Sequence, residues 1–322
     1  MTASVGGADL GSAAIDETRA ATAQARLVPP KSKVEIFEVG PRDGLQNEAG
    51  QIPTSDKIAL VDLLSDVGFR RIEVTSFVSP RWVPQLADAA QVMAGIRRKP
   101  GLRYTALTPN MQGYLAARAA GADEVAVFAS ASEGFSRANL NASIAESLTR
   151  FLPVIAAAKA DGIGVRGYVS VVTDCPYEGA VSPWAVADVA ARLLGIGCFE
   201  ISLGETLGLA HAEATDAMLR AVLTQVPADC LAGHFHDTAG RALENIDVAL
   251  SHGLRIFDAA VGGLGGCPYA PGAKGNIATE TLAAHLAARG FQTGLDAAAL
   301  ADAACLARSL HTSAGRDRGE KG

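Results

Sequence analysis

The stretch Lys33–Gly44, KVEIFEVGPRDG, decides between two α/β architectures. Its apolar run at residues 34–39 predicts a buried strand, and the turn that follows reads GPRDG. An open doubly wound sheet usually has a G-x-G-x-x-G turn after its first strand, so this turn favours a closed barrel of parallel strands. Arg42 and Asp43 stand side by side at the strand end, where an unpaired buried charge is costly, which indicates that each has a partner or a ligand.

The rest of the chain repeats one unit, a short β-branched run followed by a longer Ala/Leu-rich stretch of helical period. We expect eight strands, at residues 33–39, 70–75, 102–107, 124–129, 164–172, 197–203, 230–236 and 255–261. Eight βα units close a (β/α)8 TIM barrel.

Two of the intervening stretches illustrate the expected helices. Residues 55–68, SDKIALVDLLSDVG, are predicted to begin at an N-cap serine and to end at a glycine, and residues 182–197, SPWAVADVAARLLGIG, follow the same logic. Residues 295–310 predict an extra helix beyond the eighth unit. We therefore expect a loose tail at 1–31, the barrel at 32–290, and a C-terminal helical extension and tail at 291–322.

Composition limits the class of protein. The chain is 49% hydrophobic and 19% charged, which predicts a globular protein with a sizeable core. A net charge of −6 with scattered Lys and Arg gives no footprint for nucleic acid or anionic lipid. No apolar run is long enough for a membrane helix, and the five cysteines form no C-x-x-C pair, so we expect a cytoplasmic protein with reduced thiols.

Polar stretches follow several predicted strands. In such barrels the carboxyl ends of the strands and the loops after them form the active site, so these stretches are expected to meet at one mouth. They are Arg42 and Asp43, Glu73 with SFVSP, residues 130–141 (SASEGFSRANLN), GETLG at 204–208, His234 with His236, and residues 262–276 (GGLGGCPYAPGAKGN).

The sequence predicts a metal site at this mouth. His234 and His236 are two residues apart on a strand, so both imidazoles point to one face and can bind one cation. Asp43 and Asn276 follow neighbouring strands and complete a nitrogen and oxygen set that suits Mg²⁺ or Mn²⁺ better than structural zinc. Other interpretations stay open. The histidines can be a structural pair, Asp43 can cap the turn or pair with Arg42, and Asn276 can be an ordinary turn residue.

Three further side chains bear on the chemistry. Arg42 keeps its proton, so it is a fixed cation for a carboxylate, phosphate or enolate oxygen. Glu73 either orients Arg42 or forms an ordinary ion pair with it. Cys267 lies in a glycine-rich loop that can close over a ligand, and a thiol with a pKa of about 8.5 can donate a proton to a carbanion. The alternative for Cys267 is a small buried thiol. The combination suits carbon–carbon cleavage or formation beside a carbonyl.

At this point the residues resemble a known family, hydroxymethylglutaryl-CoA lyase, within the metal-dependent lyases and Claisen-condensing barrels. The resemblance runs from about Val34 to Glu280. Its segments are VGPRDGLQNE, TSFVSPRWVPQLAD, RGYVSVVTDCPYEG, EISLGETLG, HFHDT and GGLGGCPYAPGAKGNIATE.

The resemblance implies a retro-Claisen cleavage of 3-hydroxy-3-methylglutaryl-CoA to acetoacetate and acetyl-CoA, as in leucine degradation, by a homodimer. The implied ligands of Mg²⁺ or Mn²⁺ are Asp43, His234, His236 and Asn276. Arg42 would stabilise the thioester enolate, Glu73 would support the metal ligands, and Cys267 would help to protonate the acetyl-CoA carbanion. Asp43 or His234 would accept the hydroxyl proton, and Asn139 in SRANLNAS would contact CoA or a loop.

The chain also departs from the family pattern. GETLG has Glu205 where Asp is expected, and Ala239 and Arg241 follow HDT where Tyr and Gln are expected. These differences bear on substrate length. The alternatives are the same chemistry on a longer 3-hydroxy-3-alkylglutaryl-CoA, a Claisen-condensing acyltransferase, and a non-catalytic barrel that binds metal or acyl-CoA.

Overall fold

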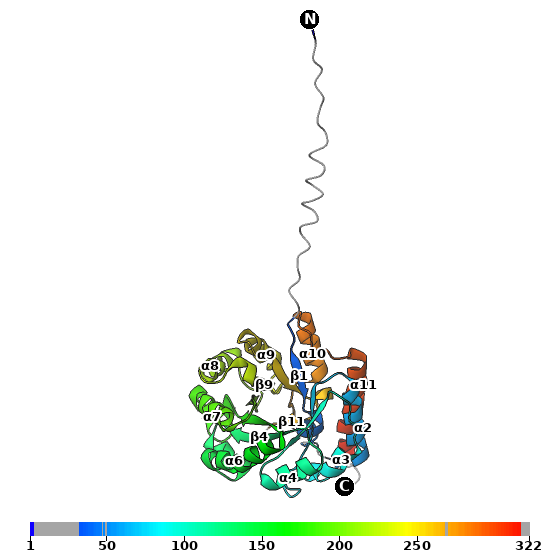
Figure 1. Cartoon of the computed structure of the whole chain (residues 1–322), viewed down its shortest axis with the longest axis vertical. Coiled ribbons are helices and arrows are strands. Elements are labelled where there is room, and N and C mark those ends of the chain that lie inside the picture. Colours follow the sequence, from blue (N-terminus) through cyan, green and yellow to red (C-terminus); the bar gives the residue numbers. More distant parts are fainter. Residues whose placement is uncertain (3–31, 47, 49, 268–269, 317–322) are drawn as a thin grey trace. The chain divides into compact units, whose positions relative to one another are not determined.

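The computed structural model describes residues 1–2, 32–46, 48, 50–267 and 270–316 of the 322-residue chain. The chain divides into Met1–Ser32 and Lys33–Gly322, and the expected tail at 1–31 lies almost wholly outside the described residues. From Lys33 onward, eight parallel strands close into a barrel in the order β1-β10-β9-β8-β5-β4-β3-β2 (Figure 1). The predicted TIM barrel is confirmed.

Each predicted strand overlaps one barrel strand. The barrel strands are β1 Glu35–Glu38, β2 Arg71–Ser76, β3 Arg103–Leu107, β4 Glu124–Ser130, β5 Gly164–Ser170, β8 Glu200–Glu205, β9 Leu231–Phe235 and β10 Ile256–Ala259. Several are shorter than expected because apolar runs continue into the turns beyond the last ladder hydrogen bonds.

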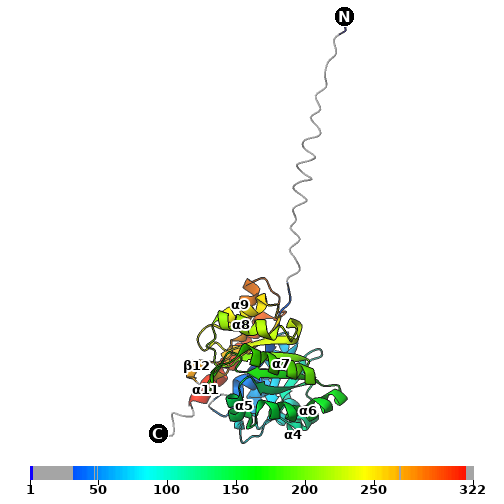
Figure 2. The ribbon, with the colours of Figure 1, turned by 90° about the vertical axis from the view of Figure 1, so that its left-hand side faces the viewer.

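Helices connect the strands and cover the outside of the barrel. They are α2 Thr54–Asp66, α3 Ala89–Gly95, α4 Met111–Ala119, α5 Glu133–Leu140, α6 Ile144–Asp161, α7 Pro183–Ile196, α8 Ala212–Val222, α9 Ala242–Ser251, α10 Thr279–Ala288 and α11 Ala297–Arg316. Figure 2 shows α7, α8 and α9 following one another around the wall. The extra C-terminal helix is α11, which packs beside α2 (Figure 1). Within the described residues, no helix has the length and apolarity needed to cross a bilayer.

The side-chain alternation of the strands separates two environments. Val125 and Val127 of β4 point outward into the main apolar core, where they join Phe151 and Val154 of α6. The inward-facing side chains include charged groups, of which Arg166 of β5 has no exposed surface. The outer core holds the barrel together, while its interior carries the polar groups that lead to the mouth.

One expected cap is wrong. Ser55 lies inside α2 rather than at its N-cap, which is Pro53 in an extended conformation, because the helix already begins at Thr54. The Thr54 hydroxyl donates to Asp88 on the neighbouring segment, 2.7 Å away. The glycine end is confirmed, since Gly68 after α2 has φ +105°.

Two short hairpins at the mouth were not predicted. One pairs β6 Asp174–Cys175 with β7 Gly179–Ala180, and the other pairs β11 Gly266–Cys267 with β12 Ala270–Lys274. The sequence indicated a flexible glycine-rich loop at the second place. Three of these strands have two residues and β12 has five, and among glycines and prolines they give no recognisable period, so alternation could not show them.

Candidate metal centre at the barrel mouth

The turn GPRDG, η1 Gly40–Gly44, presents the first two site residues. The amides of Arg42 and Asp43 donate to the Val39 carbonyl, over 3.1 and 2.8 Å. Glu38 Oε1 accepts from the Gly40 amide, and a Cβ at Gly40 would stand 2.6 Å from that oxygen. Only glycine fits there, so the turn is fixed tightly against the end of β1.

Asp43, His234 and His236 converge as the sequence predicted. One ligand atom from each lies within 4.8 Å of the other two. The Nε2 atoms of the histidines are 3.3 Å apart, and His234 Nε2 is 3.8 Å from Asp43 Oδ2. Asn276 donates from Nδ2 to Asp43 Oδ2 over 2.8 Å, and its backbone forms an isolated bridge with His236. All four predicted ligand residues therefore meet in one place.

The charge states of this cluster suit metal binding. Burial opposes ionisation of Asp43, but Arg42 and then the histidines outweigh it and lower the pKa of Asp43 to about 2. Burial, with the nearby His234, lowers the pKa of His236 to about 4. At neutral pH Asp43 is a carboxylate and His236 is neutral, which are the forms that bind metal.

Arg42 is held from two sides. Glu73 Oε2 accepts from Arg42 Nε at 2.6 Å, and Arg42 NH1 lies 2.5 Å from Asp43 Oδ1. Tyr168 Oη donates to the same Glu73 oxygen over 3.0 Å, and the guanidinium lies 5.3 Å from the Tyr168 ring centroid. Glu73 therefore orients Arg42. Its other oxygen, Oε1, is buried and has no hydrogen-bond partner among the described residues.

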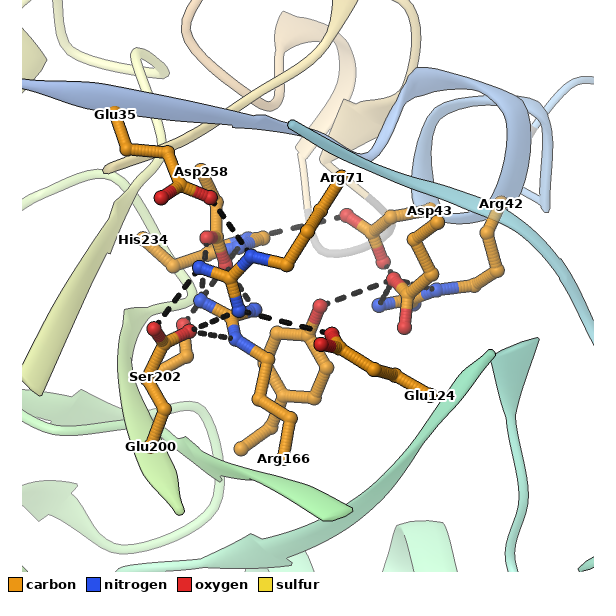
Figure 3. A network of polar contacts seen from close by, with 12 residues as sticks. Glu35, Arg42, Asp43, Arg71, Glu124, Arg166, Glu200, Ser202, His234 and Asp258 are labelled. Atoms are coloured by element: carbon orange, nitrogen blue, oxygen red, sulfur yellow. Dashed lines mark hydrogen bonds and ion pairs between the residues drawn. The ribbon is translucent and has the colours of Figure 1, made fainter. Parts of the chain in front are cut away.

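Sequence reasoning missed the residues that stand behind His234. Asp258 Oδ2 is 3.0 Å from His234 Nδ1 and accepts from the Ser202 hydroxyl at 2.8 Å, while Arg166 donates to both Asp258 oxygens (Figure 3). Burial opposes ionisation of Asp258, but Arg166 and His234 hold its pKa well below the usual range. A carboxylate on Nδ1 directs Nε2 of His234 toward the mouth. The sequence did contain a signal for Asp258, because a single aspartate inside the apolar run IFDAAV at residues 256–261 needs a buried partner.

The other expected site residues lie further from this cluster or cannot be followed to the side chain. Asn139 is exposed on α5. The backbone of Cys267 belongs to β11, and its thiol lies outside the described side chains.

The three departures from the family pattern lie at the end of β8, where Glu205 is the last residue, and in the segment between β9 and α9, which holds Ala239 and Arg241. Glu205 Oε1 accepts from the Leu209 amide at 3.2 Å, and burial raises the pKa of Glu205 to about 7. Arg241 donates to the Leu209 carbonyl at 2.9 Å, and the Ala239 amide donates to the Gly208 carbonyl. These residues therefore fix the loop after β8, and Arg241 in particular is committed to that loop.

Comparison with known proteins agrees with this geometry. Residues 33–306 match the family model described as HMGL-like. The chain is 58% identical over 82% of its length to a cytoplasmic 3-hydroxy-3-methylglutaryl-CoA lyase from Danio rerio, covering 78% of that protein. It is 55% identical over 84% of its length to a 3-hydroxy-3-isohexenylglutaryl-CoA/hydroxy-methylglutaryl-CoA lyase from Pseudomonas aeruginosa, covering 90% of it.

A solved structure gives the same relationship. The crystal structure of the HMG-CoA lyase from Brucella melitensis superposes with a TM-score of 0.87 at 59% identity, covering 87% of this chain and 99% of that one. With a family match across the whole barrel and relatives well above 50% identity, the chain belongs to the HMGL-like family, beside the hydroxymethylglutaryl-CoA lyases.

Proposed function

We propose that the protein is a divalent-metal-dependent carbon–carbon lyase that cleaves 3-hydroxy-3-methylglutaryl-CoA to acetoacetate and acetyl-CoA. The observation that carries the proposal is the convergence of Asp43, His234 and His236 beside the buried guanidinium of Arg42. The relatives named as lyases of this ester, at 52–58% identity, support the same reaction.

Asp43, His234, His236 and Asn276 are the residues that would hold the cation. Two imidazole nitrogens with carboxylate and amide oxygens, and no thiolate, fit Mg²⁺ or Mn²⁺. When bound, such a cation polarises substrate oxygens and lowers the pKa of the hydroxyl group. The ligand atoms already lie within 4.8 Å of one another for the three titratable residues, so little rearrangement is needed.

In the reaction, the bond between C2 and C3 of the acyl group breaks after the 3-hydroxyl loses its proton. C3 becomes the ketone of acetoacetate, and the electron pair passes to C2 as the enolate of acetyl-CoA. Arg42 would stabilise that enolate oxygen, since Glu73 and Asp43 hold its guanidinium in place. Cys267 on β11 would return a proton to C2.

The hydroxyl proton has two candidate acceptors. With a pKa of about 2, Asp43 is a weak base and is better suited to holding the cation. His234 has its Nδ1 occupied by Asp258, so Nε2 is the one nitrogen that could either bind the cation or take the proton, and it cannot do both at once. His234 would therefore be the base only if the other ligands hold the cation, and both residues stay candidates.

Three further parts of the proposal come from the family resemblance. Asn139, exposed on α5, would contact the CoA portion of the substrate. The active protein would be a homodimer. It would act in the cytoplasm in leucine degradation, although the similar proteins include mitochondrial as well as cytoplasmic forms.

The direct test is a product assay on 3-hydroxy-3-methylglutaryl-CoA with Mg²⁺, with and without a chelator. We expect equal amounts of acetoacetate and acetyl-CoA, loss of turnover with the chelator, and recovery when Mg²⁺ or Mn²⁺ is restored. Turnover that persists unchanged in the metal-free protein would exclude the metal mechanism, and binding of the ester without cleavage would exclude the lyase.

A further inference from the structure

The inner surface of the barrel mouth has an apolar side that the proposed chemistry does not use. Buried Leu107, Ala126 and Tyr168 form an apolar cluster separate from the main core, and half-buried Val78 and Phe128 pack against it. We call these five residues the apolar wall. They come from β3, β4, β5 and the loop after β2, whereas the metal ligands come from β9 and the segments after β1 and β10.

The position of Phe128 follows from the strand pattern. Ala126 and Phe128 are two residues apart on β4 and share a face, while Val127 between them points into the outer core. Phe128 pairs in register with Tyr168 of β5. It is therefore an inward-facing ring nearer the open end of the barrel than Ala126, and part of its surface is left uncovered.

The apolar wall borders the metal cluster through Tyr168. The centroid of the Tyr168 ring is 6.2 Å from that of His234 in an edge arrangement. The hydroxyl of Tyr168 bonds to Glu73, and the ring packs against Arg42. A molecule with polar groups on the cluster therefore places its other substituents against the apolar wall.

The substrate class matches this division. Resting on the proposed function, the acyl group carries at C3 a hydroxyl, two chains that end in polar carbonyl groups, and one alkyl group. The polar groups have partners in the cation and Arg42. The alkyl group is the one apolar substituent, and burying it against a half-buried aromatic ring removes apolar surface of both from water.

We propose that the apolar wall receives the alkyl substituent on C3 and that the Phe128 ring limits its length, which makes Phe128 a specificity-determining residue for short substituents. Val78 also lines a cleft of about 350 Å³ between the segment that joins β2 to α3 and the first turns of α4. A longer chain would run toward that cleft if Phe128 were smaller.

The test compares two esters on the same preparation, 3-hydroxy-3-methylglutaryl-CoA and 3-hydroxy-3-propylglutaryl-CoA. We expect Phe128→Ala to raise the propyl-to-methyl ratio of kcat/KM by about 10-fold or more, since each methylene in a hydrophobic pocket changes discrimination by about 10- to 200-fold. Phe128→Leu and Val78→Ala should shift the ratio less, in the same direction. Loss of folded protein lowers both rates equally and leaves the ratio unaffected.

The matched control is Phe199→Ala. Phe199 is 41% exposed and precedes β8 at the opposite end of the barrel, so its removal should leave the ratio unchanged. If Phe128→Ala and Phe128→Leu both keep the ratio within about twofold of the wild type while the wild type cleaves the methyl ester, the specificity role is wrong and the proposed function stands. If the wild type cleaves neither ester, both are wrong.

Discussion

The two ends of the barrel interior both bury arginine against carboxylates, but they leave different atoms free. Below the mouth, Arg166 donates to both oxygens of Asp258 and to Glu200, and Arg71 donates to Glu200 and Glu35, so every nitrogen of both guanidinium groups is used (Figure 3).

The mouth has polar atoms that are less completely paired. Glu73 Oε1 has no hydrogen-bond partner among the described residues, and the Nε2 atoms of His234 and His236 pair with each other, at 3.3 Å. Among the same residues, Glu124 Oε2 of the lower network also lacks a hydrogen bond, but it lies 3.9 Å from Arg71 NH1. Native proteins rarely leave buried polar atoms in this state without a functional reason. The lower network therefore supports the structure, while the mouth keeps ligand atoms available.

The largest effect should come from the mouth. Asp43→Asn removes the negative charge that faces a bound cation and one partner of Arg42, so we expect a loss in kcat/KM of at least about 1000-fold, the upper end for a preorganised charged group. The measurement is the product assay with saturating Mg²⁺. Asp216→Asn, at an exposed surface pair, serves as the control. Activity within tenfold of the wild type would contradict the assignment of Asp43.

The lower network should respond in stability instead. Arg166→Gln leaves Asp258 and Glu200 buried with incomplete partners, and breaking such a network costs about 3–5 kcal/mol. Denaturant unfolding would measure it. Arg220→Gln breaks a pair in which the arginine is 72% exposed, so solvent screens the pair and the stability should barely change. If the two variants had the same free energy of unfolding, the buried network would contribute no more to stability than an exposed ion pair, and the structural role of Arg166 would be wrong.

Glu38 is a buried carboxyl group whose hydrogen-bond donors are two backbone amides and a hydroxyl rather than an arginine. The pH dependence of stability therefore shows how a buried carboxyl behaves when no cation is bonded to it. Glu38 accepts from Gly40, Val261 and Thr279, yet burial outweighs these bonds and raises its pKa from 4.5 to about 7. A raised folded-state pKa gives stability that is present below pH 4.5 and lost as pH rises through 7, at most about 3 kcal/mol.

Glu38→Gln cannot ionise but keeps an acceptor oxygen for the two backbone amides. The wild-type Tm should therefore fall relative to that of the variant between pH 5 and pH 8. Glu73 and Glu205, which also have raised pKa values, are present in both proteins and cancel in the difference. A Tm difference that does not change with pH would show that Glu38 is ionised throughout.

The smallest effect should come from the rim. Arg241 departs from the family pattern, but its guanidinium donates to the Leu209 carbonyl and makes one partly exposed hydrogen bond. Such a bond contributes about 1 kcal/mol, which is about fivefold at most, so Arg241→Ala should change kcat/KM by less than about fivefold. A tenfold change in KM on the methyl ester would indicate that Arg241 contacts substrate after all.

The fold and the convergence of the four candidate ligands could be predicted because their signals are local. Strand alternation showed the eight βα units, and the spacing of His234 and His236 showed that both rings share a face. Closure of the barrel then brought Asp43 and Asn276 to them. A closed ring of parallel strands leaves few other places for residues at strand ends.

The supporting residues could not be predicted because their meaning depends on pairing across the barrel. Arg166 and Asp258 are 92 positions apart in the sequence. Each is a charged residue within a strand, and its partner is known only once the barrel brings the two strands together. The apolar wall could not be predicted for a similar reason. Phe128 lies in an apolar run of β4, and the sequence alone does not tell which residues of that run face the barrel interior and which face the outer core. The strands β11 and β12 pair with each other, but their sequences show no hydrophobic alternation that would have predicted them.

The central claim is that Asp43 and the two histidines bind a divalent cation at the mouth. A Mn²⁺ titration of metal-free protein, followed by electron paramagnetic resonance, measures this without substrate. We expect one tight Mn²⁺ per chain in the wild type and none in Asp43→Asn or His236→Ala, with both variants folded by circular dichroism. Stoichiometric binding that survives both substitutions, or no tight binding to the wild type, would contradict the claim.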